Sequence, residues 1–155
     1  MIFIQGNSDQ IIGEDSSNNG FRISIEYLMS QGYKKAEMYG SMWGFSDNDH
    51  ARGHYHQPEY VLYIRRFINA VLQYTEAAEI DVISHSMGVN YARRATKGGW
   101  ANIYARHGVG AEGDKYYIGQ PLSQSLIHLS QFLVLFMDCN VAVRMIWLTC
   151  WLATQ

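Results

Sequence analysis

Hydrophobic positions in the first 46 residues form two short apolar runs and one stripe with helical spacing. Met1 to Gln5 is an apolar run that ends at a glycine, which is typical of a buried strand. Asn7 to Gly20 is polar and rich in Gly, Asn and Ser, so it is predicted to be a loop. Ala36 to Gly40 can form a second strand. The helical stripe lies between them, ahead of a glycine suited to a helix C-cap, and comprises Phe21, Ile25, Leu28 and Met29.

A stronger amphipathic helix is predicted after the polar segment from Asp47 to Gln57. Pro58 suits its first turn, because the missing N–H is not needed there. Its apolar stripe comprises Val61, Ile64, Ile68, Val71 and Leu72. Glu79 to Ser84 then predicts a strand, and Gly88 to Ala95 predicts the start of another helix. Strands that alternate with helices indicate an α/β fold with a mostly parallel sheet flanked by helices.

The segment from Ser125 to Gln155 differs from the rest, because its many apolar residues follow neither the helical nor the strand period cleanly. We therefore expect an α/β domain over residues 1–124 and an atypical hydrophobic tail over 125–155 that is not a separate domain. Asp138 and Arg144 interrupt the tail, so no stable membrane span is expected.

Composition and charge exclude several classes of protein. The 155 residues suit one domain, and 48% hydrophobic with 17% charged residues is ordinary for a globular protein. A net charge of −2 without a basic stripe gives no reason to expect nucleic acid as a partner. Cys139 and Cys150 lack metal-site spacing. The opening "MIFIQG" has no basic region, so no signal peptide is expected in this chain.

The sequence "DVISHSMGV", from Asp81 to Val89, leads from a predicted strand into a predicted helix through Ser86. In a nucleophile elbow, a sharp turn of this kind presents the serine Oγ at the carboxyl edge of the sheet. Small residues two positions before and after the serine let the strand and helix backbones pass closely, and Ser84 and Gly88 occupy these positions. The alternative is that Ser86 is an ordinary helix N-cap, where serine is favoured.

An elbow of this type also needs two N–H groups to stabilise an oxyanion. The backbone N–H of Met87, beside the serine, is one candidate. The first predicted strand ends at Gln5-Gly6-Asn7, and the glycine allows the backbone to approach a ligand closely. The N–H of Asn7 is therefore the second candidate, and the two signals together favour a catalytic Ser86 over a cap.

The strings "IFIQGNSD" and "SHSMG" resemble the class 2 lipases of the α/β-hydrolase superfamily, a group that includes small bacterial triacylglycerol lipases. "GFRISIEYLMSQGYKKAEMYGSMWG", "EYVLYIRRFINAVLQYT" and "DVISHSMGVNYARRATKGG" are more similar still to the nematode branch. The resemblance covers roughly Ile2 to Gly99 and implies a secreted lipid esterase with a Ser-Asp-His triad and no cofactor. Matched by motif, Ser86 is the nucleophile, and Asn7 and Met87 supply the oxyanion N–H groups. Gln5 departs from the histidine that is usual in the family.

The acid and base of the triad are not identified, because the family strings around them are absent. In this fold they follow the serine in the order acid, then histidine. The candidates after Ser86 are Glu112, Asp114 and Asp138 for the acid, and His107 and His128 for the base. Only Asp114 followed by His128 gives Asp before His, and the remaining chain is short for two more strand–helix units. The chain is therefore expected to be at best a feeble hydrolase.

The tail suggests one reason for the missing residues. The neighbouring reading frame of Phe136 to Cys139 encodes Tyr or His, then Gly, then Leu, which resembles family sequence shortly after "PLS". One hypothesis is that the chain leaves the family's frame near Ile127. The alternative is a genuine, divergent amphipathic tail, and the sequence leaves both open.

Two function classes follow from these patterns. The first is a serine hydrolase of lipid or small esters, either lipase-like or a small-ester carboxylesterase or thioesterase. The second is a catalytically inactive or truncated relative that lacks the triad acid and base. A polar segment that combines two aspartates with three histidines could bind a metal, but a solvated loop is the expected interpretation, because the spacing matches no known site. These residues are Asp47, Asp49, His50, His54 and His56.

Overall fold

The computed structural model describes residues 1–15, 18–46, 57–102, 115–122 and 127–132. The predicted loop from Asp47 to Gln57 lies outside these residues except for its last position. Within the described part, the chain forms a parallel sheet flanked by helices, as the alternation of strands and helices predicted.

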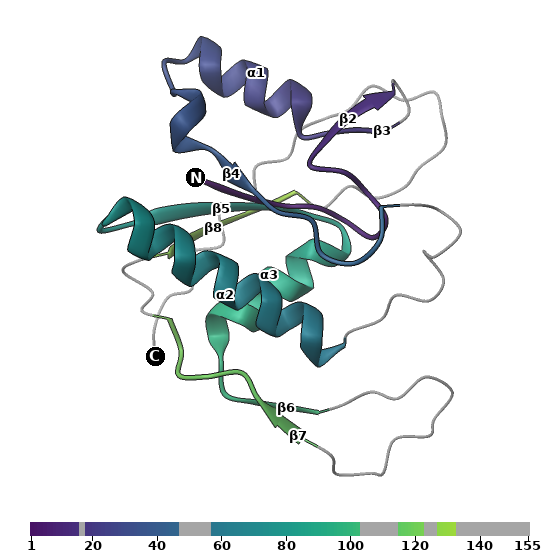
Figure 1. The fold of residues 1–155 in the computed structure, drawn as a ribbon, viewed down its shortest axis with the longest axis vertical. Coiled ribbons are helices and arrows are strands. Elements are labelled where there is room, and N and C mark those ends of the chain that lie inside the picture. The colour runs from purple at the N-terminus through teal and green to yellow at the C-terminus, as the bar shows by residue number, and fades with distance from the viewer. Residues whose placement is uncertain (16–17, 47–56, 103–114, 123–126, 133–155) are drawn as a thin grey trace.

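The central sheet contains four strands in the order β4-β1-β5-β8, and every neighbouring pair is parallel. The strands are β1 (Ile2–Ile4), β4 (Tyr39–Gly40), β5 (Ile80–His85) and β8 (Ile127–Phe132). Because all four strands run in one direction, their carboxyl ends meet at one edge of the sheet. The loop after β1 and the turn after β5 both lie at this edge (Figure 1).

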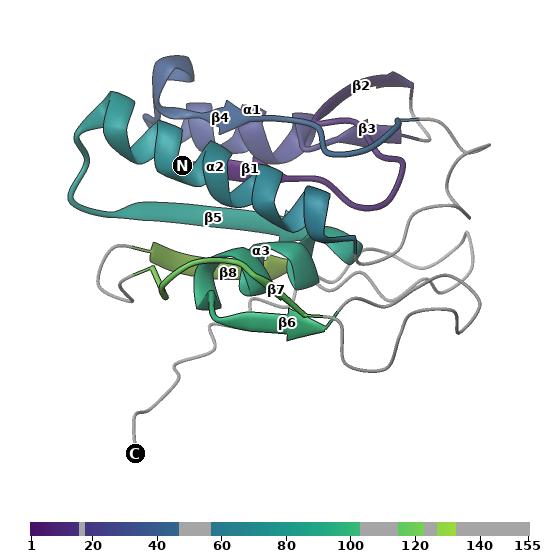
Figure 2. The ribbon, with the colours of Figure 1, turned by 60° about the horizontal axis from the view of Figure 1, so that its bottom comes forward.

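Helices cover both faces of the sheet (Figures 1 and 2). Helix α1 (Arg22–Ser30) lies on one face, while α2 (Pro58–Thr75) and α3 (Met87–Lys97) lie on the other. Helix α2 begins at the predicted proline and buries Val61, Ile64, Ile68 and Val71, four positions of the predicted stripe.

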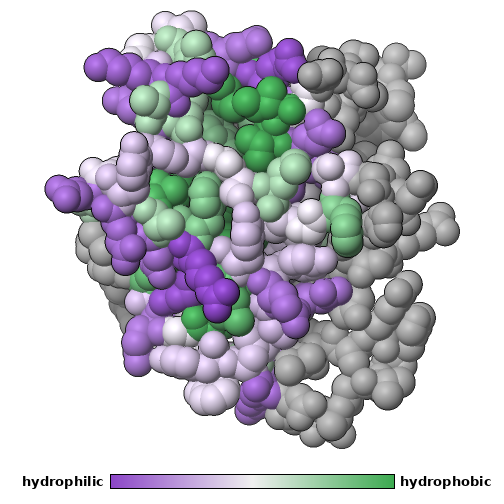
Figure 3. All heavy atoms as spheres, viewed as in Figure 1, coloured by the Kyte–Doolittle hydropathy of each residue, from purple (hydrophilic) through white to green (hydrophobic). Residues whose placement is uncertain are grey.

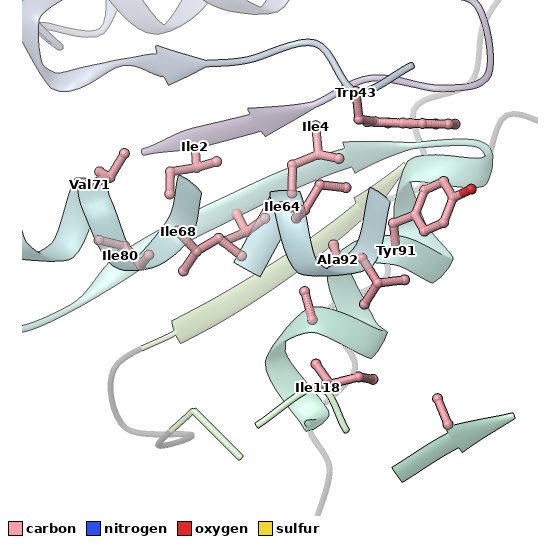
Figure 4. Close-up of a cluster of buried hydrophobic side chains, with 14 residues drawn as sticks. Ile2, Ile4, Trp43, Ile64, Ile68, Val71, Ile80, Tyr91, Ala92 and Ile118 are labelled. Carbon is pink, nitrogen blue, oxygen red and sulfur yellow. The ribbon is translucent and has the colours of Figure 1, made fainter. Parts of the chain in front are cut away.

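The side chains of β1 divide between the two faces because successive residues of a strand point in opposite directions. Ile2 and Ile4 join the large core under α2 and α3, whereas Phe3 joins a smaller core under α1. Figure 4 shows the large core, in which the Trp43 ring packs edge-on against Tyr91 with ring centroids 4.3 Å apart. Burial in this core raises the pKa of Tyr91 above its ordinary value.

The structure corrects two predicted segments. Residues Asn7 to Gly20 were expected to be a loop, but they contain β2 (Ile12–Asp15) and β3 (Asn18–Gly20), which pair antiparallel. Ala36 to Gly40 was expected to be a strand, but it contains part of the 3-10 helix η1 (Lys35–Glu37) and only the two residues of β4. In the first segment the polar residues hide the strand pattern, and pairing between β2 and β3 decides the structure. In the second segment only the last two residues pair with β1, so the strand is shorter than expected.

The chain beyond α3 continues as an antiparallel ribbon of β6 (Trp100–Asn102) and β7 (Lys115–Tyr117). Strand β8 then returns to the central sheet beside β5, so Ile127–Phe132 of the atypical tail belong to this sheet. The domain boundary at residue 124 stays a prediction.

Among the residues with a described position, no helix is both long enough and apolar enough to span a membrane.

Candidate active site

Ser86 occupies a one-residue turn between the end of β5 at His85 and the start of α3 at Met87. Its backbone has φ 52° and ψ −127°. A positive φ is unusual for a residue with a side chain, and such conformations are typical of functional sites, where the surrounding structure enforces them. The chain can change from strand to helix within one residue because Ser86 adopts this conformation.

The same geometry argues against an ordinary capping role for Ser86. An N-cap serine usually has an extended backbone, and its side chain accepts a hydrogen bond from an N–H of the first helical turn. Ser86 stands at the N-cap position of α3, but its backbone is not extended and its side chain makes no capping hydrogen bond. The conformation instead matches the sharp strand-to-helix turn expected of an elbow.

Small residues permit close packing on both sides of this turn. A Cβ atom at Gly88 would lie only 2.2 Å from the carbonyl oxygen of Gln5 and 2.8 Å from that of Ile4, so α3 crosses β1 at a distance that only glycine allows. Ser84, on the other side, is fully buried. Its Oγ has no hydrogen-bond partner among the residues that the structure describes.

The loop after β1 lies directly against the Ser86 turn. A Cβ atom at Gly6 would lie 3.0 Å from the Cβ of Ser86 and 2.8 Å from Nδ1 of His85. Asn7 is the next residue, and Ser8 after it is buried with a left-handed φ of 60°. The structure thus brings the segment with Asn7 to the turn that carries Ser86 and Met87. The catalytic roles of these three residues stay predictions.

Gln5, the departure from the family pattern, is buried behind this loop. Its side-chain amide lies between the backbones of Ser41 and Trp43, and the Trp43 indole N–H donates to the Gln5 carbonyl oxygen at 2.9 Å. Gln5 therefore connects the end of β1 to the segment after β4.

One contact at the site was missed from the sequence. Nδ1 of His85 donates a hydrogen bond to Oδ2 of Asp9 at 2.9 Å, and both side chains are about a quarter exposed, at 26% and 29%. The two residues lie 76 positions apart, so neither periodicity nor spacing indicated that they meet. The sequence did offer one indication of this contact: His85 stands directly before the proposed nucleophile, and Asp9 stands three residues after Gly6.

The structure places the backbone of His128 away from Ser86. His128 pairs in register with Asp81, five residues before Ser86 along β5. A strand advances about 3.3 Å per residue, so the His128 backbone lies roughly 16 Å behind the level of Ser86. The other candidates for the acid and the base, namely His107, Glu112, Asp114 and Asp138, lie outside the described residues.

The histidine-rich segment considered for metal binding, residues 47–56, also lies outside the described residues. Within the part of the chain that is described, no group of three His, Cys, Asp or Glu side chains is arranged to hold a metal ion.

Comparison with known proteins identifies the family of the chain. No curated protein matches the chain closely enough to count as a relative. The model of the family described as lipase (class 2) matches residues 1–127, which include every described element through the start of β8. Members of this family are lipase-like ester hydrolases. The chain therefore belongs to the class 2 lipase family.

Proposed function

We propose that this protein is a serine hydrolase of the α/β-hydrolase fold that acts on carboxylic esters of lipids, with Ser86 as its nucleophile. The observation that carries the proposal is the strained backbone of Ser86 at the turn between β5 and α3. The Gly6 loop packed against this turn supports the same conclusion, because it brings a second backbone segment to the serine.

In the proposed reaction, Oγ of Ser86 attacks the ester carbonyl carbon, and the carbonyl electron pair moves onto the oxygen. The backbone N–H groups of Asn7 and Met87 donate to this oxyanion. Met87 is the first residue of α3, and the first N–H groups of a helix have no partner within the helix. Collapse of the intermediate breaks the ester C–O bond, and the leaving oxygen takes up, through solvent, the proton lost from the Ser86 hydroxyl, so that an alcohol departs and an acylated serine remains. Water then adds to the acyl carbon, the acid is released, and Ser86 regains a proton from that water.

We further propose that turnover by this chain is slow because no residue that the structure describes gives Ser86 an efficient base. A serine hydroxyl is a weak nucleophile until a neighbouring base accepts its proton, and that base must come within about 3 Å or act through one water. The register of β8 keeps the His128 backbone far from the serine. The oxyanion donors and substrate binding alone leave roughly a 10³–10⁴-fold acceleration over water.

The surroundings of the site favour lipid esters over small polar ones. Exposed apolar side chains occur in the segments that follow β1 and β4 at the carboxyl edge: Ile12, Met42 and Phe45 are exposed by 54%, 48% and 57%. Figure 3 shows hydrophobic residues gathered among hydrophilic ones in the upper half of the view, near β2. We also propose that the protein is secreted, because membership of the class 2 lipase family is compatible with secretion.

The test is hydrolysis of a short-chain p-nitrophenyl ester, together with modification of Ser86 by a fluorophosphonate followed by intact mass. We expect slow turnover and slow labelling, both abolished in Ser86→Ala and unchanged in Ser30→Ala, where the serine lies exposed on α1. Equal rates of hydrolysis by Ser86→Ala and the unmodified chain would show that Ser86 is not the nucleophile. Fast hydrolysis by the unmodified chain would refute the proposal that Ser86 lacks an efficient base. Restoring the neighbouring reading frame after about Ile127 is expected to raise activity by supplying an acid and a histidine.

A further inference from the structure

We propose that the hydrogen bond between Asp9 and His85 is a positioning device, which holds the loop Gly6–Asp9 in place so that the Asn7 N–H meets the oxyanion formed at Ser86. This inference rests on the proposed function of Ser86. It assigns a role to two residues that do not themselves touch the reacting atoms.

The loop is held at both of its ends by the Ser86 turn. At one end, Gly6 lies so close to this turn that an added Cβ would come within 3.0 Å of the Ser86 Cβ. At the other end, the Asp9 carboxylate accepts the hydrogen bond from His85, the residue directly before Ser86. Asn7 lies between these two attachments. Contacts of Gly6 and Asp9 with Ser86 and His85 therefore restrain the backbone of Asn7 relative to the serine.

The loop needs such an attachment because its backbone is strained. Ser8 has a left-handed φ of 60° although it carries a side chain, and it is buried. Strained conformations persist only where the surrounding contacts enforce them. The Ser8 hydroxyl bonds to the neighbouring Asn7 side chain, a local contact that does not connect the loop to the sheet. The Asp9–His85 hydrogen bond does make that connection, across 76 positions of sequence.

Gly6 explains why this arrangement fits around the serine. A Cβ at this position would lie 2.4 Å from Oδ2 of Asp9 and 2.8 Å from Nδ1 of His85, so the hydrogen bond passes directly over the glycine. The absence of a side chain at Gly6 allows both the hydrogen bond and the approach to Ser86. The segment "GNSD" at residues 6–9 and the pair "HS" at residues 85–86 are distant in the sequence, but they form one structural unit.

A positioning role has a specific kinetic signature. An oxyanion donor is used in the transition state and not in the ground state, so loosening it lowers kcat with little change in KM. Removing one donor outright costs about 10²–10³ in kcat. A loop that is loosened but still present should cost less, and we expect roughly a 10-fold to 100-fold loss.

The first experiment measures the rate at which a fluorophosphonate modifies Ser86, together with kcat and KM for the p-nitrophenyl ester. Asp9→Ala and His85→Ala are each expected to slow labelling and kcat by about 10-fold or more, and the double variant should be no slower than the slower single one, because both act through one contact. His85→Gln, whose amide can still donate to Asp9, should recover part of the rate. Gln10→Ala is the control, since this side chain makes no hydrogen bond with another described residue.

The second experiment is independent of catalysis and follows amide hydrogen exchange in the full chain. Asp9→Ala should accelerate exchange in a peptide covering Gln5 to Asp9 by about 10-fold, with exchange in α2 unchanged, and Gln10→Ala should not. Unchanged exchange in this peptide, or labelling by Asp9→Ala at the rate of the unmodified chain, would overturn the positioning role. Labelling that persists in Ser86→Ala would instead overturn the proposed nucleophile, so the two failures are distinguishable.

Discussion

Gly88→Ala is the substitution that most directly tests the packing of the elbow. A Cβ at this position would lie 2.2 Å from the Gln5 carbonyl oxygen, 2.8 Å from the Ile4 carbonyl oxygen and 3.0 Å from the Gln5 carbonyl carbon. All three atoms belong to the backbone of β1 or its immediate continuation, so no side-chain rotation relieves the clash. Since real Cβ contacts are essentially never below 3.0 Å, the N-terminus of α3 must move away from β1 by roughly 0.8 Å or more.

The expected loss of stability follows from two opposing effects. Overpacking a well-packed interior costs about 1–3 kcal/mol, and a clash with two backbone carbonyls belongs at the upper end of this range. Replacing glycine by alanine within a helix recovers about 1 kcal/mol of helix propensity. The net expectation is a loss of about 2 kcal/mol in the free energy of unfolding. A displacement of about 1 Å can also cost roughly 10²-fold in rate, because Met87 moves relative to the Gly6 loop.

Urea denaturation followed by tryptophan fluorescence measures the stability, and fluorophosphonate labelling of Ser86 measures the site. Asn90→Ala is the matched control, because Asn90 is exposed in the same helix and the change tests helix propensity without a clash. It should be neutral or slightly stabilising. A Gly88→Ala variant as stable as the unmodified chain and labelled at the same rate would refute the close crossing of α3 and β1.

Two further predictions concern the same site and the core beside it. Gly6→Ala should slow labelling of Ser86 by about 10-fold or more, because the added Cβ would lie 2.4 Å from Oδ2 of Asp9 and displace the loop; labelling at an unchanged rate would contradict this. Tyr91→Phe should make the protein less sensitive to alkali, because burial, and secondarily Tyr60, raise the folded-state pKa of Tyr91 above its ordinary value of 10. The neutral phenol thus contributes stability that is fully present below pH 10 and declines as the pH rises above it. Urea midpoints at about pH 8 and pH 10.5 should fall less in Tyr91→Phe than in the unmodified chain, and an equal fall in both proteins would count against the assignment.

Several elements of the fold could be predicted because local patterns determine them. Helix α2 begins at Pro58 and buries the predicted stripe, since a fixed φ and apolar spacing specify a helix and its inner face without further information. The apolar run at the N-terminus forms β1, and the predicted strand before Ser86 forms β5, because short apolar runs specify buried strands. Polar segments could not be assigned in this way. The hairpin of β2 and β3 lies in a segment whose composition is that of a loop, and its strands exist because they pair with each other.

The sequence by itself determined the sharp strand-to-helix turn at Ser86. Ser86 stands between an apolar strand and an amphipathic helix with small residues at Ser84 and Gly88, and these local features lead to the turn that the structure contains. Only the tertiary structure decided what surrounds the serine. The register of β8 places His128 opposite Asp81, and the contact between Asp9 and His85 joins positions 76 residues apart. Both depend on how strands from distant parts of the chain align in one sheet, and no local period or spacing encodes that alignment.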